Sequence, residues 1–282
     1  MTVGKLKIAT CQFAVSKSIQ RNARNICNYM RRAKKAKAHL VHFSECALSG
    51  YAGSELDTLE RLDGDLLRRE TRKIMALAAR LKLWVVLGST HQLTPPNKPH
   101  NSLYLINPRG RLADRYDKRF CTERDLLHYS PGSRFVTFKV NQVKCALLIC
   151  FDLRFPELYR QLKKLKVDCI IQSFYNARQK KRSIHTDIMR QTMQCRAATN
   201  YFWVSMANSS AYYSPYPSCF IRPDGCILKQ LRFHRPGLMV NTVDLNRKFI
   251  DMMAPFRPLA MSGILSNGPE LKDPRSRKTN IL

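Results

Sequence analysis

The sequence has little glycine and proline, and it has no long hydrophobic run. Eleven Gly and 14 Pro among 282 residues are too few for a collagen-like or low-complexity chain. The longest stretch without a charged residue, 197–221, is rich in Asn, Ser and Pro, so we expect no membrane span. Lys5 and Lys7 interrupt the first apolar residues, so no secretory signal is expected.

Paired cysteines and phosphate-binding glycine motifs are also absent. None of the ten cysteines forms a Cys-x-x-Cys pair, and no His-Glu-x-x-His motif occurs, so the sequence predicts no metal site. Neither GxGxxG nor GxxxxGK[ST] occurs, which gives no support to a nucleotide-phosphate loop. We expect reduced thiols and a cytoplasmic location.

Acidic residues are scarce. The chain has 49 Lys and Arg against 20 Asp and Glu, a formal net charge of +29. Such a surface attracts nucleic acid or anionic lipid through phosphate contacts. The basic residues are interleaved with apolar ones at helical spacing, and no aromatic-rich RNA-binding motif accompanies them. We therefore favour a solvated basic surface and keep a nucleic-acid-binding face as the alternative. The basic clusters lie at 31–37, 160–166, 178–182 and 272–278.

What the sequence does contain is enough apolar residues for a packed core, with 44% of its residues hydrophobic. Strands alternate with helices, and further strands cluster as hairpins between them. This pattern predicts an α/β layered sandwich with mixed sheets rather than a barrel. We expect helices over 19–33, 66–82, 156–166 and 184–199. We expect strands over 7–13, 40–43, 83–89, 102–107, 112–116, 135–140, 143–150, 167–172, 201–207, 218–222, 227–231 and 238–243.

Three chemically complementary side chains follow predicted strands. Cys150 ends an apolar run, Glu45 follows a short buried strand, and Lys118 follows the second strand of a hairpin. Ligand sites of α/β proteins gather at strand ends. Each residue alone has a plain structural interpretation, as an inert thiol, a capping carboxylate and a solvated lysine.

Together the three form a set that can hydrolyse an amide. A thiol with a pKa of about 8.5 is mostly protonated at neutral pH. We expect a neighbouring ammonium to favour the thiolate, and a carboxylate to take and return the proton. The thiolate can then attack a carbonyl carbon, and the lysine with a backbone N–H can stabilise the oxyanion.

Three sequence blocks resemble the nitrilase superfamily of carbon–nitrogen hydrolases. They are Phe43-Ser-Glu-Cys-Ala-Leu-Ser-Gly-Tyr51, Tyr116-Asp-Lys-Arg-Phe120 and Leu148-Ile-Cys-Phe-Asp-Leu-Arg-Phe-Pro-Glu157. They occur in the order and with the spacing typical of that family, and Cys195-Arg-Ala197, Ala207-Asn208 and Ser218–Gly225 support them. Three blocks in order are a specific signal, and the resemblance extends to about Arg257.

The resemblance implies a four-layer αββα sandwich and a carbon–nitrogen hydrolase domain over 1–266. The residues over 267–282 are polar, and we expect them to form an extended tail. The resemblance also implies a homodimer or larger homo-oligomer and cofactor-free hydrolysis through a thioester. Cys150 would be the nucleophile, Glu45 the general base, and Lys118 the oxyanion stabiliser and proton donor. The amide of Phe151 would complete the oxyanion hole.

Two further positions of the site stay open. Many members of the family carry a second glutamate before a Pro-Gly pair, and here Glu123 and Asp125 precede Pro131-Gly132. We favour Asp125 for its spacing, although an aspartate departs from the pattern and a capping role explains it equally well. Asn176 is a candidate for the substrate pocket, with packing as its plain interpretation.

The residues after the cysteine indicate the reaction. Phe-Asp-Leu-Arg-Phe-Pro-Glu is similar to the amidase-type branches, so we expect a small carboxamide or N-carbamoyl substrate and release of ammonia. The basic surface favours an anionic substrate through electrostatic steering. The alternative is a catalytically weak hydrolase scaffold that binds nucleic acid or another anion through that surface.

Overall fold

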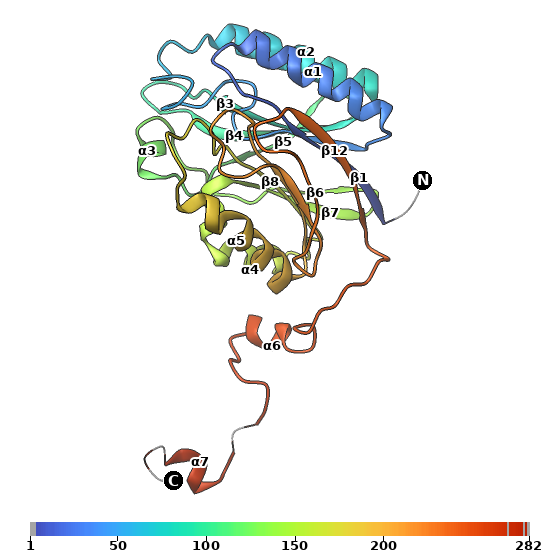
Figure 1. Cartoon of the computed structure of the whole chain (residues 1–282), viewed down its shortest axis with the longest axis vertical. Helices are drawn as coiled ribbons and strands as arrows, with labels where there is room; N and C mark the ends of the chain where they lie inside the picture. Colours follow the sequence, from blue (N-terminus) through green and yellow to red (C-terminus); the bar gives the residue numbers. More distant parts are fainter. Residues whose placement is uncertain (1–3, 270, 279, 281–282) are drawn as a thin grey trace. The chain divides into compact units, whose positions relative to one another are not determined.

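Two mixed β-sheets, each of six strands, form the centre of the part of the chain that the structure describes (Figure 1). The computed structural model describes residues 4–269, 271–278 and 280. In the first sheet β1, β2 and β3 run parallel, and the other strands pair antiparallel. Its strands, in spatial order, are β12 (Gly237–Asp244), β1 (Lys5–Gln12), β2 (Leu40–His42), β3 (Trp84–His91), β4 (His100–Ile106) and β5 (Leu112–Asp117).

The second sheet repeats this arrangement with three parallel strands, β7, β8 and β9, at its centre. Asn141 and Gln142 join β6 to β7 with φ angles of 49° and 69°, as the two-residue turn of a hairpin requires. The strands, in spatial order, are β11 (Ile227–Gln230), β10 (Cys219–Ile221), β9 (Trp203–Ala207), β8 (Cys169–Ser173), β7 (Val143–Ile149) and β6 (Thr137–Val140).

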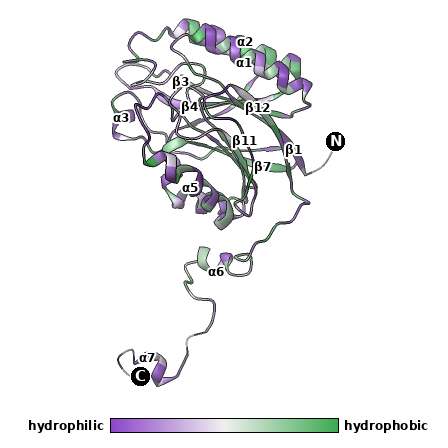
Figure 2. Ribbon diagram, viewed as in Figure 1, coloured by the Kyte–Doolittle hydropathy of each residue, from purple (hydrophilic) through white to green (hydrophobic). Residues whose placement is uncertain are grey.

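Long helices cover the outer faces of both sheets (Figure 1). Helices α1 (Ile19–Lys35) and α2 (Gly64–Leu81) cover the first sheet, and α4 (Pro156–Lys164) and α5 (Ile184–Asn200) cover the second. Figure 2 shows α1 and α2 with alternating hydrophilic and hydrophobic colours, as amphipathic helices have. The fold is therefore an α/β four-layer αββα sandwich with mixed sheets, and the prediction is confirmed.

Strand alternation decides which layer receives each apolar side chain. Leu40 and Val86 pack in the core between the two sheets. Val41 and Val85 point the other way and pack with the helices that cover the first sheet. Successive side chains of a strand face opposite sides. Consecutive apolar residues in the central strands therefore serve both the core between the sheets and the core under the helices.

The chain beyond the sandwich forms a second compact unit. The first compact unit ends at Phe249 and the second begins at Ile250, before the boundary expected at 266. Apolar residues after 249 resemble core in the sequence, yet several of them are exposed. The second unit contains two short helices, α6 (Arg257–Met261) and α7 (Pro274–Arg277), so the tail expected to be extended is partly helical. Among the described residues no helix is long and apolar enough to cross a membrane.

A buried histidine joins the two sheets. His42 on β2 is fully buried, and its Nδ1 lies 2.9 Å from Ser205 Oγ of the second sheet. Its Nε2 lies 3.0 Å from Ser173 Oγ. Both ring nitrogens therefore have partners across the interface. Burial lowers the pKa of His42 from 6.5 to about 3, so the imidazole is neutral in the folded protein at neutral pH.

We expect this histidine to make the fold acid-sensitive. The unfolded chain binds a proton at His42 below about pH 6.5 while the folded chain does not, so stability is lost as the pH falls. When the pH is lowered from about 7 to about 5, protonation of His42 in the unfolded chain reduces the free energy of unfolding by about 2 kcal/mol. Denaturant unfolding at both pH values tests this, and His42→Gln should reduce the difference. An equal loss in both proteins would contradict it.

Candidate active site

Glu45 lies just beyond the end of β2, pressed against β3. A Cβ atom at Gly88 of β3 would lie 2.2 Å from Ser44 O and 2.7 Å from Cys46 N. Only glycine therefore lets the segment that carries Glu45 lie this close to the strand. The backbone N–H of Glu45 donates to Phe174 O, directly after β8 of the second sheet, at 3.2 Å. This hydrogen bond places the segment that carries the carboxylate between the two sheets.

Lys118 directly follows β5 and is held by its neighbours' backbones. Its N–H donates to Asn101 O at 2.9 Å, and Gly132 N donates to Lys118 O at 2.8 Å. A Cβ at Gly132 would lie 2.5 Å from Asp117 O, so the Pro-Gly pair noted in the sequence allows a close approach of two backbones. The Lys118 side chain is 1% exposed.

Cys150 sits at the turn between β7 and a 3-10 helix, η1 (Cys150–Arg154). Its φ is 38°, a left-handed conformation that costs an ordinary residue about 1–3 kcal/mol. The buried Asp152 carboxylate accepts from Ile149 N at 2.9 Å and Phe120 N at 3.0 Å. It thereby ties the cysteine turn to the segment that follows Lys118.

The Lys118 ammonium lies between two buried carboxylates. Its Nζ is 2.9 Å from Glu45 Oε1 and 2.8 Å from Asp125 Oδ2. Glu45 also accepts from Asn101 Nδ2 at 2.7 Å and from Tyr175 N at 2.7 Å. A buried ion pair persists only where further hydrogen bonds satisfy its atoms, and the partners of Glu45 meet that condition.

The electrostatics of this group favour a charged lysine and a basic glutamate. Burial raises the pKa of Glu45, although Lys118 opposes the shift. Burial alone would lower the pKa of Lys118, but the negative charges around it, with Glu45 first, raise it well above its usual value. Lys118 therefore keeps its proton while Glu45 becomes a stronger base than a solvated carboxylate.

Opposing effects act on the pKa of the Cys150 thiol. Lys118 does act to lower the pKa of Cys150, but burial, with help from Glu45, outweighs it and raises that pKa above the usual value. A base close to the sulfur would therefore assist its attack on a carbonyl carbon. The Cys150 Sγ accepts a hydrogen bond from Asn176 Nδ2 at 3.3 Å.

Asp125, and not Glu123, contacts the lysine. Thr122 begins the short helix α3 (Glu123–Leu126), and Asp125 completes a capping box with it. The other oxygen of Asp125 accepts from the Tyr51 hydroxyl. The side chain of Asp125 thus caps a helix and also binds Lys118, and its role as a second active-site carboxylate stays a prediction. Glu123 is exposed on the same turn.

Asn176 is held in place by Asn208. The Asn176 N–H donates to Asn208 Oδ1 at 2.9 Å, and Asn208 Nδ2 donates to Asn176 O at 3.3 Å. Because Asn208 follows β9 and Asn176 follows β8, the pair joins two strand ends. Phe151 directly follows Cys150 in η1, and its predicted part in an oxyanion hole stays a prediction.

Sequence reasoning missed several residues that support the site. Asn101 and Tyr175 bind Glu45, and Asp152 aligns the cysteine turn. The rings of Tyr51 and Tyr175 stack with centroids 4.7 Å apart. Asp152 lies within a recognised block, so its place there was a usable signal. No pattern in the sequence marks Asn101. Among the described residues, no group of three or more His, Cys, Asp or Glu is placed to hold a metal ion.

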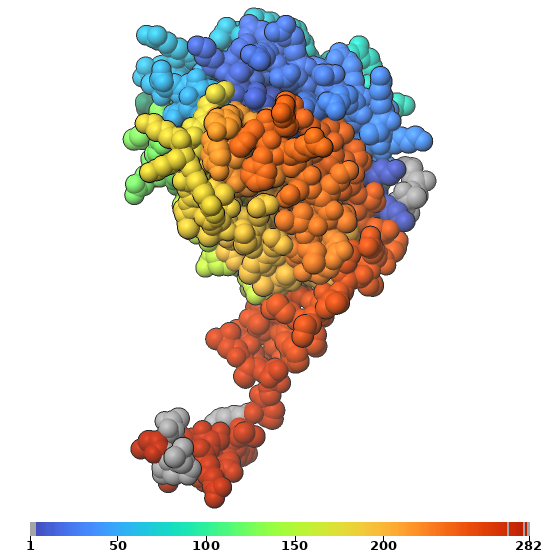
Figure 3. Space-filling view, viewed as in Figure 1, coloured from blue at the N-terminus to red at the C-terminus, as the bar shows by residue number. Residues whose placement is uncertain are grey.

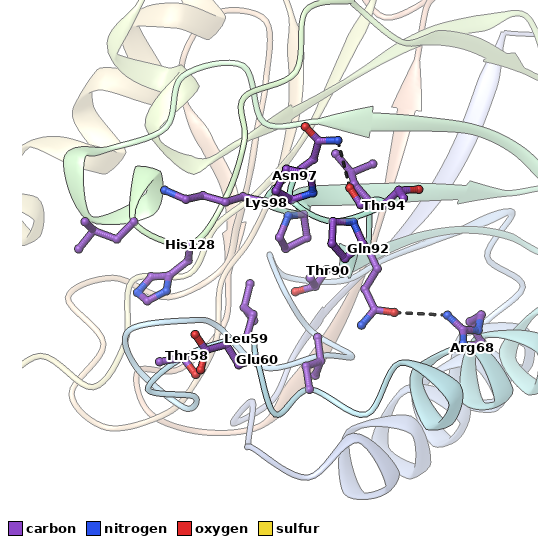
Figure 4. Close-up of a pocket in the computed structure, with 16 residues that line it drawn as sticks. Thr58, Leu59, Glu60, Arg68, Thr90, Gln92, Thr94, Asn97, Lys98 and His128 are labelled. Atoms are coloured by element: carbon purple, nitrogen blue, oxygen red, sulfur yellow. Dashed lines mark hydrogen bonds between the residues drawn. The ribbon is translucent and has the colours of Figure 1, made fainter.

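A separate hollow of about 960 Å³ lies beyond the end of β3 (Figure 4). The loop through Pro95 and Pro96 and the residues after α3 line it, and Glu45, Lys118 and Cys150 do not. Arg68 donates to Gln92 Oε1 at 3.3 Å at one side of it. Since none of the three predicted catalytic side chains reaches this hollow, we assign it no part in the reaction.

The comparison with known families agrees with the geometry. The carbon-nitrogen hydrolase family matches residues 7–248, which include the three recognised blocks and nearly all of the sandwich. The chain belongs to the carbon–nitrogen hydrolase family. The resemblance to the nitrilase superfamily, which the sequence blocks predicted, is confirmed.

Curated relatives of this carbon–nitrogen hydrolase are similar at low identity. An (R)-stereoselective amidase from Pseudomonas is 29% identical over 173 residues, 60% of this chain and 58% of the relative. The omega-amidase of Mus musculus is 28% identical over 162 residues, 54% of this chain and 57% of that protein. This chain thus covers less than two thirds of these relatives. A hydrolase in the agr operon of Staphylococcus lugdunensis is 30% identical, with 70% and 84% covered.

Solved structures share the fold. An amidase of the nitrilase superfamily from Nesterenkonia superposes with a TM-score of 0.73 at 19% identity, covering 85% of this chain and 90% of that one. A glutamine-dependent NAD+ synthetase from Acinetobacter baumannii superposes with a TM-score of 0.72 at 20% identity, covering 86% and 46%. At such identities the likeness concerns the fold of the hydrolase alone.

We expect Asp125→Asn to weaken the fold and the site of this hydrolase together. It removes a charge from the Lys118 group, and the lost charge-assisted hydrogen bonds cost about 1–3 kcal/mol of the free energy of unfolding. Denaturant unfolding measures this. Glu123→Gln, on the same short helix but exposed, is the matched control and should change stability by less than about 0.5 kcal/mol. Equal effects of both changes would contradict the assignment.

Proposed function

We propose that this carbon–nitrogen hydrolase cleaves the C–N bond of a small carboxamide or N-carbamoyl compound and releases ammonia, with Cys150 as the nucleophile. The observation that carries the proposal is the convergence of three strand ends. They bring Glu45, whose pKa is raised, and the charged Lys118 into one buried group. The charges of this group shift the pKa of the Cys150 thiol.

The first half of the proposed reaction forms a thioester. Glu45 takes the proton of the Cys150 thiol as the sulfur attacks the carbonyl carbon of the amide. Lys118 and the amide of Phe151 stabilise the negative oxygen of the tetrahedral intermediate. The carbon–nitrogen bond then breaks, the nitrogen takes a proton from Lys118 or Glu45, and ammonia leaves.

The second half releases the acid. Glu45 takes a proton from water, the resulting hydroxide attacks the thioester carbonyl carbon, and the carbon–sulfur bond breaks. The thiolate of Cys150 recovers a proton and the product is a carboxylate. Raising the pKa of Glu45 suits it to act as a base in both halves, because a solvated carboxylate is too weak to take a thiol proton readily.

Asp125 and Asn176 are proposed to position the reacting groups. Asp125 holds Lys118 from the side opposite Glu45, at 2.8 Å, so that the ammonium is fixed between two carboxylates. Asn176 donates to the Cys150 sulfur at 3.3 Å and is itself fixed by Asn208. A donor at that position favours the thiolate as it forms.

The names of the relatives support an amide rather than a nitrile as substrate, since an amidase and an omega-amidase are among them. A mutant of the Nesterenkonia amidase carries the acetamide moiety of fluoroacetamide covalently added at its active-site cysteine. The net charge of +29 supports an anionic substrate, such as an amide that also bears a carboxylate, because a positive field raises its rate of encounter.

The protein is proposed to act as a homodimer. Within the second unit, the described residues expose many large apolar side chains, which a second copy would remove from water. They are Ile250, Met252, Met253, Phe256, Leu259, Ile264, Leu265 and Leu271. The cytoplasmic location stays a prediction from the cysteine content.

We expect Cys150→Ala to abolish ammonia release from a panel of carboxamides and N-carbamoyl acids, with a loss of about 10⁴-fold or more. Cys195→Ala, which removes an exposed thiol, is the matched control and should retain full turnover. Glu45→Gln should slow both halves, and intact-protein mass spectrometry should then detect the acyl adduct on Cys150. Turnover that survives in Cys150→Ala would refute the nucleophile.

We expect light scattering to give twice the mass of one chain at micromolar concentration. Replacing Leu265 and Met252 by Ser should shift the equilibrium toward the single chain. The smaller, polar serine side chains gain less free energy from burial between two copies. Replacing the exposed Leu112 of β5 by Ser is the matched control. A monomer at every concentration would refute the dimer.

A further inference from the structure

Four rings from two distant loops gather on the surface. Tyr212 and Tyr213 lie in the loop after β9, and Phe233 and His234 lie between β11 and β12. The His234 ring centroid is 4.8 Å from that of Tyr212 and 5.2 Å from that of Tyr213. Phe233 extends the group, with its centroid 5.8 Å from His234. We call these four residues the aromatic cluster.

Core residues hold the aromatic cluster in place. His234 Nε2 lies 3.0 Å from Ser214 O, which joins the two loops. The side-chain Nε2 of the buried Gln12 donates to Arg232 O at 2.9 Å and to Arg235 O at 2.8 Å. The rings are therefore presented by a fixed turn, and little order would have to be gained when a ligand stacks on them.

Two rings of the aromatic cluster are exposed, and Tyr213 and His234 are half-buried. Tyr212 is 75% exposed and Phe233 is 41% exposed. Single exposed apolar residues are ordinary, but four neighbouring rings are a feature of binding surfaces. In Figure 3 the yellow segment around residue 180 adjoins the orange segments on this face, and Gln179 N donates to Tyr213 O at 3.1 Å.

Positive side chains surround the rings. Arg232 and Arg235 flank Phe233 and His234 in the chain and are exposed. The guanidinium carbon of Arg190 lies 5.9 Å from the Phe233 ring centroid. Arg182 is paired with Asp187. The segment 227–237 contains no acidic residue.

We propose that the aromatic cluster and its arginines bind single-stranded nucleic acid. Exposed rings beside the exposed Arg232 and Arg235 match the two parts of a nucleotide, because bases stack on the rings and the arginines bind phosphates. An anionic lipid surface offers the phosphates but no planar group for the rings, and a duplex keeps its bases stacked internally. The proposal does not depend on the hydrolytic function.

The sequence alone did not indicate this site, because its two halves lie about 20 residues apart and neither resembles a nucleic-acid-binding motif. The segment 197–221 supplies rings without charge, and the segment 227–237 supplies the charge. Only the pairing of β10 with both β9 and β11 brings the two loops together.

Fluorescence anisotropy of a labelled 20-nucleotide oligouridylate with the full chain tests the proposal. We expect binding in the micromolar range or tighter at about 50 mM salt, weakening steeply as salt is added. Tyr212→Ala should weaken it about tenfold, while Tyr212→Phe, which keeps the ring, should not. Arg235→Gln should weaken binding and reduce the salt slope by about one.

Arg69→Gln is the matched control for charge, because Arg69 is exposed on α2. It should weaken binding less than Arg235→Gln does. A DNA duplex of the same length should compete poorly. The proposal is overturned by no binding, by a Tyr212→Ala variant that binds like wild type, by equal effects of both arginine changes, or by equal competition from the duplex. Thermal unfolding confirms that each variant is folded, and ammonia release tests the hydrolytic site independently.

Discussion

The buried ammonium of Lys118 between two carboxylates is the interaction on which the site depends. Removing three charges from water is costly unless each has close partners, and this cost fixes the surrounding geometry. Glu45, Lys118 and Asp125 come from three separate segments, so those segments have to meet with little freedom. The close approaches at Gly88 and Gly132 follow from the same need, because any larger side chain would push the segments apart.

The same group sets the protonation of the cysteine. Burial keeps the Cys150 proton on sulfur, and the nearby carboxylates add to that effect. The pKa of Glu45 is also raised, above that of an ordinary carboxylate, so Glu45 holds a proton more readily. In the proposed reaction the raised pKa of Glu45 suits it to take the thiol proton as the sulfur attacks. This differs from a thiolate stabilised permanently by a lysine.

Charge is distributed unevenly between the site and the surface. Glu45, Asp125 and Lys118 together carry a formal charge of about −1 when ionised, whereas the chain carries +29. The positive charge therefore lies outside the reacting group, where it can attract anions without changing the chemistry. The arginines beside the aromatic cluster belong to this outer charge.

The sequence by itself determined the layers of the fold and the family, and it proposed three residues for the site. Alternating strands and amphipathic helices predicted the αββα sandwich, because side-chain periodicity reflects burial directly. The blocks around Glu45, Lys118 and Cys150 marked one family. Tertiary structure decided what periodicity does not encode. It selected Asp125 over Glu123 as the partner of Lys118, it brought Asn101 to Glu45, and it joined Tyr212 to His234. These contacts form between residues distant in the chain, and only the packing of both sheets sets their distances.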